Sequence, residues 1–146
     1  MSSFYVDPFA IAKSEGILVI PRYDLDVNGL IKKDSINGNI VIEYDASMHQ
    51  NRERFTIAHE LGHYFAGHLE DGHTLFRDPS KNFNLHNYDP YEAEANKLAA
   101  EMLMPKEKID FLIQKANYHT IDDIADALRV SPAAMTYRLK NLGYIS

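Results

Sequence analysis

One short stretch, residues 54–68, constrains the fold and the chemistry of this chain more than any other: RFTIAHELGHYFAGH. It holds three histidines and a glutamate within an apolar run. His59 and His63 are four residues apart, and side chains at that spacing lie on one face of an α-helix, with Cβ atoms about 5–6 Å apart. Two imidazoles in that arrangement can bind one cation, and zinc binds histidine nitrogen at about 2.0–2.1 Å. The stretch therefore predicts a helix that holds a metal ion.

Glu60 lies one residue round the same helix, beside the open coordination position rather than where a third ligand would be. A carboxylate there can take a proton from water activated by the metal and pass it to a leaving amine. The same letters could occur in a purely structural helix, but a capped amphipathic helix around them favours a metal site. Gly62 would permit close packing of this helix.

A catalytic zinc needs a third protein ligand and one open position. The chain has no cysteine, so every ligand must come from His, Asp or Glu. The downstream candidates are His68, His73, His86, Asp89, Glu92 and Glu94. We expect His68 to lie beyond the end of the helix, solvated or capping it, and we expect His73 and His86 to lie in polar loops.

Glu92 is the favoured third ligand, because it shares a helix face with Asn96, four residues later. Asn96 could then accept a hydrogen bond from a ligating histidine and fix its tautomer. Glu94 points elsewhere and is expected to be a solvated helix residue. The favoured site is one zinc ion per chain, held by His59, His63 and Glu92, with Glu60 as the catalytic base.

Periodicity and turn residues predict an α+β fold. A small N-terminal antiparallel or mixed β-sheet should pack on the HELGH helix and on the helix that carries Glu92. The expected strands are residues 17–21, 29–33 and 39–45. The expected helices are residues 8–15, a HELGH helix capped by Ser47 and running toward Gly67, residues 91–104, residues 105–117 and two short helices within 120–143. We predict a single domain over 1–146, with a catalytic core of about 1–104 and a helical part of about 105–146.

The last two predicted helices have the shape of a helix-turn-helix, with Arg138 and Lys140 on the second. Asp122, Asp123 and Asp126 crowd the first helix, and the net charge of the chain is −6. Phosphate binding needs a basic surface, so we favour a structural helix pair that closes the fold over a DNA reader.

Composition places the chain among ordinary soluble proteins, with 45% hydrophobic and 25% charged residues. The N-terminus lacks the basic and apolar regions of a signal peptide, and the longest strongly apolar run is only residues 17–20. We therefore expect a cytoplasmic protein with no membrane partner. The sequence does not predict an oligomeric state.

Two segments together resemble the ImmA/IrrE family of bacterial and phage metallopeptidases: RERFTIAHELGHYFAGH and EAEANKLAAEMLMP. The C-terminal VSPAAMTYRLKNLGYI is also similar to the ending of that family. The Glu-x-x-x-Asn spacing resembles the Glu-x-x-x-Asp of thermolysin-like zinc peptidases. The resemblance covers nearly the whole chain and is densest over residues 54–67 and 92–105.

This resemblance implies zinc-dependent cleavage of a regulatory protein, typically a helix-turn-helix repressor of a phage, a mobile element or a stress response. The family's roles fall on His59, His63 and Glu92 as ligands and on Glu60 as the catalytic base. Two alternatives stay open: an antirepressor that sequesters its partner without cutting it, and a DNA-binding regulator. In either case the metal site would serve structure or partner binding.

Two further features of the site are expected from the sequence. The edge of the strand at 39–45 should hold an extended substrate by strand addition, through Ile40, Val41, Ile42 and Tyr44. An oxyanion also needs a hydrogen-bond donor besides the metal. The candidates for that donor are Tyr64, His73, Tyr88 and Tyr91.

Overall fold

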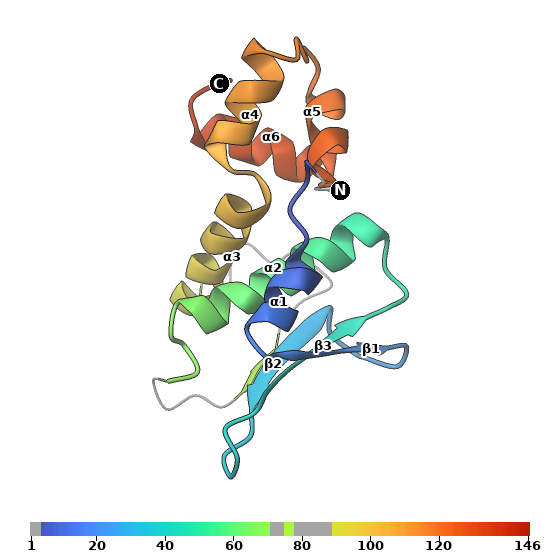
Figure 1. Ribbon diagram of the computed structural model, residues 1–146, viewed down its shortest axis with the longest axis vertical. Coiled ribbons are helices and arrows are strands. Elements are labelled where there is room, and N and C mark those ends of the chain that lie inside the picture. Colours follow the sequence, from blue (N-terminus) through green and yellow to red (C-terminus); the bar gives the residue numbers. More distant parts are fainter. Residues whose placement is uncertain (1–3, 71–74, 78–88) are drawn as a thin grey trace.

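The computed structural model describes residues 4–70, 75–77 and 89–146, and within them the fold is α+β, as predicted (Figure 1). A small sheet lies at one end of the molecule, three helices lie at the other, and α1, α2 and α3 lie between them. The helices are α1 (Pro8–Ser14), α2 (Gln50–Phe65), α3 (Pro90–Leu103), α4 (Lys106–Gln114), α5 (Ile121–Leu128) and α6 (Pro132–Asn141). The strands are β1 (Leu18–Arg22), β2 (Gly29–Lys33), β3 (Ile40–Asp45) and β4 (Leu75–Arg77). None of these described helices combines the length and apolarity needed to cross a membrane.

The described strands form a mixed sheet in the order β1-β3-β2-β4. β3 runs parallel to β1 and antiparallel to β2, and β2 runs antiparallel to β4. The expectation that the edge of β3 receives a substrate is therefore wrong, because both edges of β3 are paired. The residues that were assigned to it, Ile40, Val41, Ile42 and Tyr44, pair with β1 on one side and β2 on the other. The alternating pattern of the strand indicates which face is buried, but strand order depends on non-local pairing.

The start of α2 differs from the prediction. Ser47 does not cap the helix, because its backbone N–H and its hydroxyl both donate to Asp45 Oδ1, at 3.0 and 2.6 Å. These bonds form a turn directly after β3, as Asp side chains commonly do. The helix begins three residues later, where His49 Nδ1 accepts the backbone N–H of Asn51 at 3.0 Å.

α2 is buried on two sides. One apolar cluster joins it to the sheet and α1, and a second joins it to α3 and the C-terminal helices. The first cluster includes Ile31, Ile42, Ile57 and Leu61, and the second includes Ala58, Leu103, Leu128 and Met135. Several polar residues of this helix therefore lie in a low-dielectric interior, where an uncompensated charge is costly: Arg54, Thr56, His59, Glu60 and His63.

The C-terminal helices form as predicted on either side of the turn at 129–131. Thr120 caps α5, and Ser131 caps α6. Arg138, one of the two basic residues considered for DNA contact, instead donates from Nε to the Met104 carbonyl at 2.9 Å. The preference for a structural helix pair, and the single-domain organisation, stay predictions.

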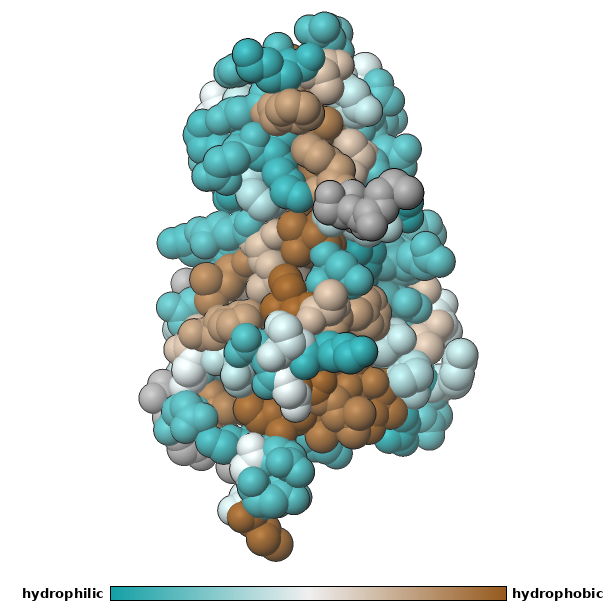
Figure 2. Space-filling view, viewed as in Figure 1, coloured by the Kyte–Doolittle hydropathy of each residue, from teal (hydrophilic) through white to brown (hydrophobic). Residues whose placement is uncertain are grey.

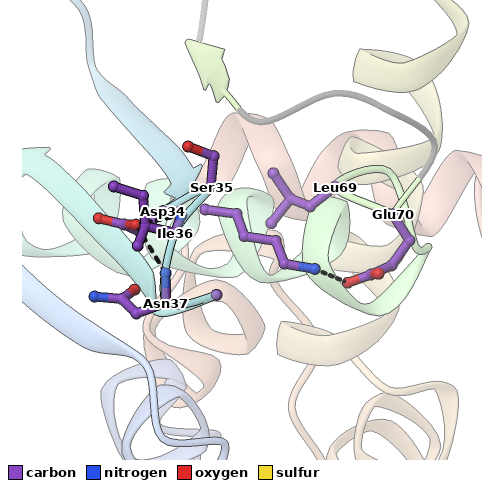
Figure 3. Close-up of a pocket in the computed structure, with 8 residues that line it drawn as sticks. Asp34, Ser35, Ile36, Asn37, Leu69 and Glu70 are labelled. Carbon is purple, nitrogen blue, oxygen red and sulfur yellow. Dashed lines mark hydrogen bonds and ion pairs between the residues drawn. The ribbon is translucent and has the colours of Figure 1, made fainter.

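The turn between β2 and β3 projects from the sheet (Figure 1), and Ile36 within it is 95% exposed. Figure 2 shows an apolar tip at that end of the molecule. Beside the turn lies an open pocket, where Lys33 Nζ pairs with Glu70 Oε1 at 2.7 Å (Figure 3). Asp34 Oδ1 accepts the N–H groups of Ile36 and Asn37, and these bonds lower the pKa of Asp34. The pocket is a feature of the turn and is separate from the histidines of α2.

Arg54 connects α2 to the N-terminal segment and to the C-terminal helices. Its side chain is 9% exposed, Nε donates to the Arg129 carbonyl at 3.2 Å, and a terminal nitrogen donates to the Val6 carbonyl. Its guanidinium lies 5.0 Å from the centre of the Tyr5 ring.

Arg54→Met keeps the length of the side chain but leaves the carbonyls of Val6 and Arg129 without this donor. We expect the free energy of unfolding to fall by about 1.5–3 kcal/mol in chemical denaturation. The exposed Arg52→Met should change it by less than about 0.5 kcal/mol, and equal losses in the two variants would contradict the assignment.

Candidate metal centre

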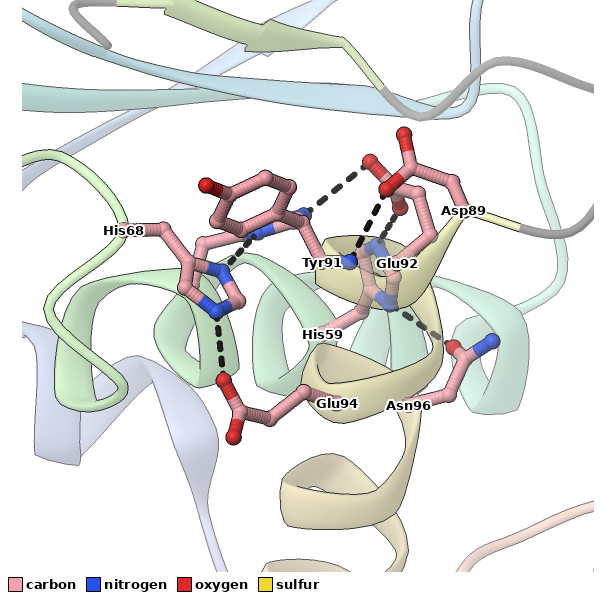
Figure 4. Close-up of polar contacts among 8 residues, drawn as sticks. His59, His68, Asp89, Tyr91, Glu92, Glu94 and Asn96 are labelled. Atoms are coloured by element: carbon pink, nitrogen blue, oxygen red, sulfur yellow. Dashed lines mark hydrogen bonds and ion pairs between the residues drawn. The ribbon is translucent and has the colours of Figure 1, made fainter. Parts of the chain in front are cut away.

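Two histidines of α2 and one glutamate of α3 converge at a buried point (Figure 4). His59 Nε2 lies 2.6 Å from Glu92 Oε2, and His63 Nε2 lies 3.2 Å from Glu92 Oε1. The two histidines are at most 4% exposed, and the Glu92 side chain is 15% exposed. The structure thus brings together the three residues that the sequence suggests as ligands.

Asn96 lies one turn further along α3, with Oδ1 2.7 Å from His59 Nδ1. An amide oxygen only accepts, so Nδ1 of His59 is the donor in this bond. With its proton on Nδ1, a neutral His59 would present the Nε2 lone pair to a cation. This is the tautomer that a ligand bound through Nε2 requires. Without a cation, the 2.6 Å contact between Nε2 and Glu92 Oε2 is a hydrogen bond, which needs a proton between the two atoms.

Burial and the contacts between these side chains shift the pKa values of His63 and Glu92. Burial lowers the pKa of His63, although the adjacent Glu92 carboxylate acts in the opposite direction. Burial raises the pKa of Glu92, but hydrogen bonds to His59 and His63 outweigh it and lower that pKa to about 2. A neutral imidazole and an ionised carboxylate are the forms that bind a cation.

Glu60 is fully buried on the same helix. Single ligand atoms of His59, Glu60 and His63 all lie within 4.8 Å of one another. β2 comes close on this side, since a Cβ added to Gly29 would lie 3.2 Å from Glu60 Oε2. The Glu60 carboxylate is therefore held between α2 and the first residue of β2, next to the two histidines.

The residues present fit a zinc ion. Two ligand atoms at zinc-bond distance and tetrahedral angle lie about 3.3 Å apart. The separation of His63 Nε2 from Glu92 Oε1 is 3.2 Å, whereas that of His59 Nε2 from Glu92 Oε2 is 2.6 Å. A shift of less than about 1 Å in the side chains of His59 and Glu92, with the helices kept in place, would thus suit the ion. Two imidazoles with one carboxylate is also the donor set of one class of catalytic zinc site.

The expectation for His68 is right in part. It lies beyond the end of α2, and its backbone N–H donates to the carbonyl of His63 in the last turn at 3.0 Å, but it is 2% exposed and therefore not solvated. Its Nδ1 lies 2.8 Å from His63 Nδ1, and its Nε2 lies 2.6 Å from Glu94 Oε1. Glu94 is partly exposed as expected, but it has a specific partner. The chain turns back after α2 and buries His68, a tertiary event that helix periodicity does not predict.

Phe76 of β4 is a residue of the site that the sequence analysis missed. Its ring stacks on the His63 ring, with centroids 4.3 Å apart and planes 18° apart. The pair Leu75-Phe76 is the only apolar pair in a polar stretch, residues 70–82, and this is the signal that could have indicated it. Phe76 covers one face of a histidine that would bind the metal.

The candidate donors for an oxyanion differ in their surroundings. The Tyr64 hydroxyl donates to Glu15 Oε1, at the C-terminal end of α1, at 2.9 Å, so this donor already has a carboxylate partner in the structure. The Tyr91 ring packs edge-on against His68, with centroids 4.7 Å apart, and Tyr91 stays a candidate (Figure 4). His73, Tyr88 and the alternative ligand His86 lie outside the described residues.

Comparison with known proteins shows which family has a sequence of this kind. The sequence model of a peptidase family described as the IrrE N-terminal-like domain matches residues 12–140. The chain belongs to this family. This confirms the resemblance found in the sequence, and the matched residues include both histidines of α2, Glu60 and Glu92.

A relative also matches along most of its length. "Uncharacterized immunity region protein 2" of Bacillus phage phi105 is 34% identical over 139 residues, which cover 93% of this chain and 80% of the relative. Membership of an IrrE-like peptidase family indicates a hydrolase of the peptidase type, and the cluster around His59 and His63 could hold its metal.

The close approach of β2 to Glu60 gives a testable prediction. A Cβ at Gly29 would lie 2.5 Å from Thr56 Cγ2, so Gly29→Ala forces the strand away from α2 or displaces the side chains there. We expect unfolding to become easier by about 1–3 kcal/mol, as for other overpacked cores. Thr56→Ser removes Cγ2, and the double variant should recover part of this loss in thermal unfolding. If the double variant is no more stable than Gly29→Ala alone, the contact is not the cause.

Proposed function

We propose that this protein is a zinc-dependent endopeptidase that cleaves a regulatory protein in the cytoplasm. The proposed substrate is a helix-turn-helix repressor of a phage or mobile element. One observation carries the proposal. In the buried interior, His59 Nε2 and His63 Nε2 each contact one carboxylate oxygen of Glu92, and Glu60 lies beside the two histidines. The name of the phi105 relative, an immunity region protein, supports the phage context.

His59, His63 and Glu92 would hold the zinc, and Asn96 would keep His59 in its ligating tautomer. Zinc, when bound, supplies a Lewis acid that polarises the scissile carbonyl and lowers the pKa of water. Glu60 takes a proton from the attacking water as its oxygen bonds to the carbonyl carbon. It then delivers that proton to the amide nitrogen as the C–N bond breaks. The buried position of Glu60 suits both transfers, because bulk water does not compete for the proton.

The substrate would lie along β4 rather than β3. β4 is an edge of the sheet among the described strands, and its Phe76 stacks on His63. An extended peptide that pairs with an exposed strand uses main-chain hydrogen bonds, which is how many proteins bind unfolded segments. Figure 4 shows this strand running above the polar cluster.

The test is cleavage of a candidate helix-turn-helix repressor, chosen from the genes that neighbour the one for this protein. Purified repressor is incubated with the zinc-loaded protein, with protein treated with excess chelator, and with chelated protein to which zinc is returned. We expect two fragments with zinc, intact repressor with chelator, and recovered cleavage after zinc is restored. Mass spectrometry of the fragments gives the scissile bond.

Two results would count against the proposal. Equal cleavage in the presence of excess chelator would remove the role of the metal. Tight binding of the repressor without cleavage, under conditions where the protein holds one zinc, would favour the sequestering antirepressor instead.

A further inference from the structure

A second polar chain leads away from the metal centre through His68. His63 Nδ1 contacts His68 Nδ1 at 2.8 Å, and His68 Nε2 contacts Glu94 Oε1 at 2.6 Å. In Figure 4, His68 lies between another imidazole and Glu94, with a dashed line to each. His63 and His68 are almost completely buried, whereas the side chain of Glu94 is 56% exposed. The chain therefore connects a buried ligand to a carboxylate at the surface.

The direction of these hydrogen bonds follows from the acceptor at the end. A carboxylate only accepts, so His68 Nε2 carries the proton in the bond to Glu94. In a neutral His68, Nδ1 is then unprotonated and accepts from His63 Nδ1. His63 thus carries a proton on Nδ1, and Nε2, which faces Glu92 Oε1 at 3.2 Å, is the nitrogen that would bind a cation. The opposite direction would put the proton of a neutral His63 on Nε2, which would prevent coordination.

Contacts from the backbone and from two aromatic rings hold His68 in place. Its backbone N–H donates to the His63 carbonyl at 3.0 Å, which folds the chain back over the last turn of α2. The rings of Tyr91 and Phe76 pack against it, with centroids 4.7 and 5.7 Å away. An imidazole held in this way offers its acceptor to His63 with little loss of side-chain entropy.

Side chains of α3 hold the two histidines of α2 in different ways. Asn96 reaches His59 Nδ1 directly, whereas Glu94 lies two residues away on α3 and reaches His63 only through His68. We propose that His68, oriented by Glu94, is a positioning residue that holds His63 with Nε2 available for zinc. This inference rests on the zinc site proposed above.

Zinc affinity is the first test, measured by competition with a chromogenic chelator. His68→Leu removes the acceptor, and we expect zinc to bind about 10- to 100-fold more weakly. His68→Asn keeps an oxygen close to the position of Nδ1 and should recover much of this loss. Glu94→Ala, at a partly exposed position, should weaken binding less than His68→Leu while the fold is unchanged. His119→Leu, at an exposed histidine, is the matched control and should leave the affinity at its original value.

Nitrogen-15 NMR of the histidine rings tests the direction of the bonds without relying on activity. In the zinc-loaded protein we expect His63 to be protonated on Nδ1 and His68 to be protonated on Nε2. A His68 ring protonated on Nδ1 would overturn the inference, and so would unchanged zinc affinity in His68→Leu.

The two proposals fail differently. If the wild-type protein binds no zinc, the proposed function fails and this inference fails with it. If wild type binds zinc and cleaves its substrate, but His68→Leu and His68→Asn bind zinc as tightly as wild type, only the role of His68 is wrong.

Discussion

Glu60→Gln should reduce cleavage by at least about 10³-fold in kcat/KM, because an amide cannot take the proton from water or return it to the leaving amine. The substitution is nearly isosteric, and Glu60 is fully buried beside His59 and His63 without being one of the proposed ligands. The variant should therefore still bind one zinc per chain. The measurement is the initial rate of repressor cleavage, together with zinc content by metal analysis.

Glu101→Gln is the matched control, since it makes the same change at an exposed position on α3. Its cleavage rate should equal that of wild type. A reporter of repression separates the remaining alternatives in cells. If Glu60→Gln relieves repression as well as wild type does, the protein acts by binding its partner, and the proposed peptidase activity is not what relieves repression.

Gly62→Ala should both destabilise the protein and weaken zinc binding. A Cβ at Gly62 would lie 2.6 Å from the Ala95 carbonyl oxygen and 2.9 Å from the Ala95 Cα. Both are backbone atoms, so α3 as a whole must move away from α2. α3 carries Glu92, Glu94 and Asn96, each of which contacts a histidine of the site. We expect a loss of about 1–3 kcal/mol in the free energy of unfolding and zinc affinity lower by about 10- to 100-fold.

The direction of the stability change in Gly62→Ala distinguishes this contact from an ordinary helix effect. In an exposed helix, replacing Gly by Ala stabilises by about 0.8–1.0 kcal/mol. Arg52→Ala, at an exposed position of α2, measures the effect of a new alanine without contact to α3. Thermal unfolding and chelator competition on the two variants would decide the matter, and a more stable Gly62→Ala with normal zinc affinity would show that the helices are not held by this contact.

Local sequence patterns were sufficient for most of the elements. Proline indicated where α1 and α3 begin, because its fixed φ suits the first turn of a helix and its missing N–H is not needed there. The i, i+4 spacing on α2 and on α3 was sufficient to suggest His59, His63, Glu92 and Asn96, since that spacing fixes which side chains share a helix face. Family motifs were available for the same residues, and the family match confirms the membership.

The features that the sequence did not determine all depend on long-range packing. In the observed strand order, β3 has two neighbours and β4 lies at an edge. The proposed substrate-binding strand is therefore β4 and not β3. The return of the chain after α2 buried His68 between His63 and Glu94, although a histidine beyond a helix end is usually solvated. By itself, the sequence determined the helices, the faces that carry the ligands and the family. Only the tertiary structure decided which side chains support those ligands, because hydrogen bonds between distant segments depend on how the helices and strands pack.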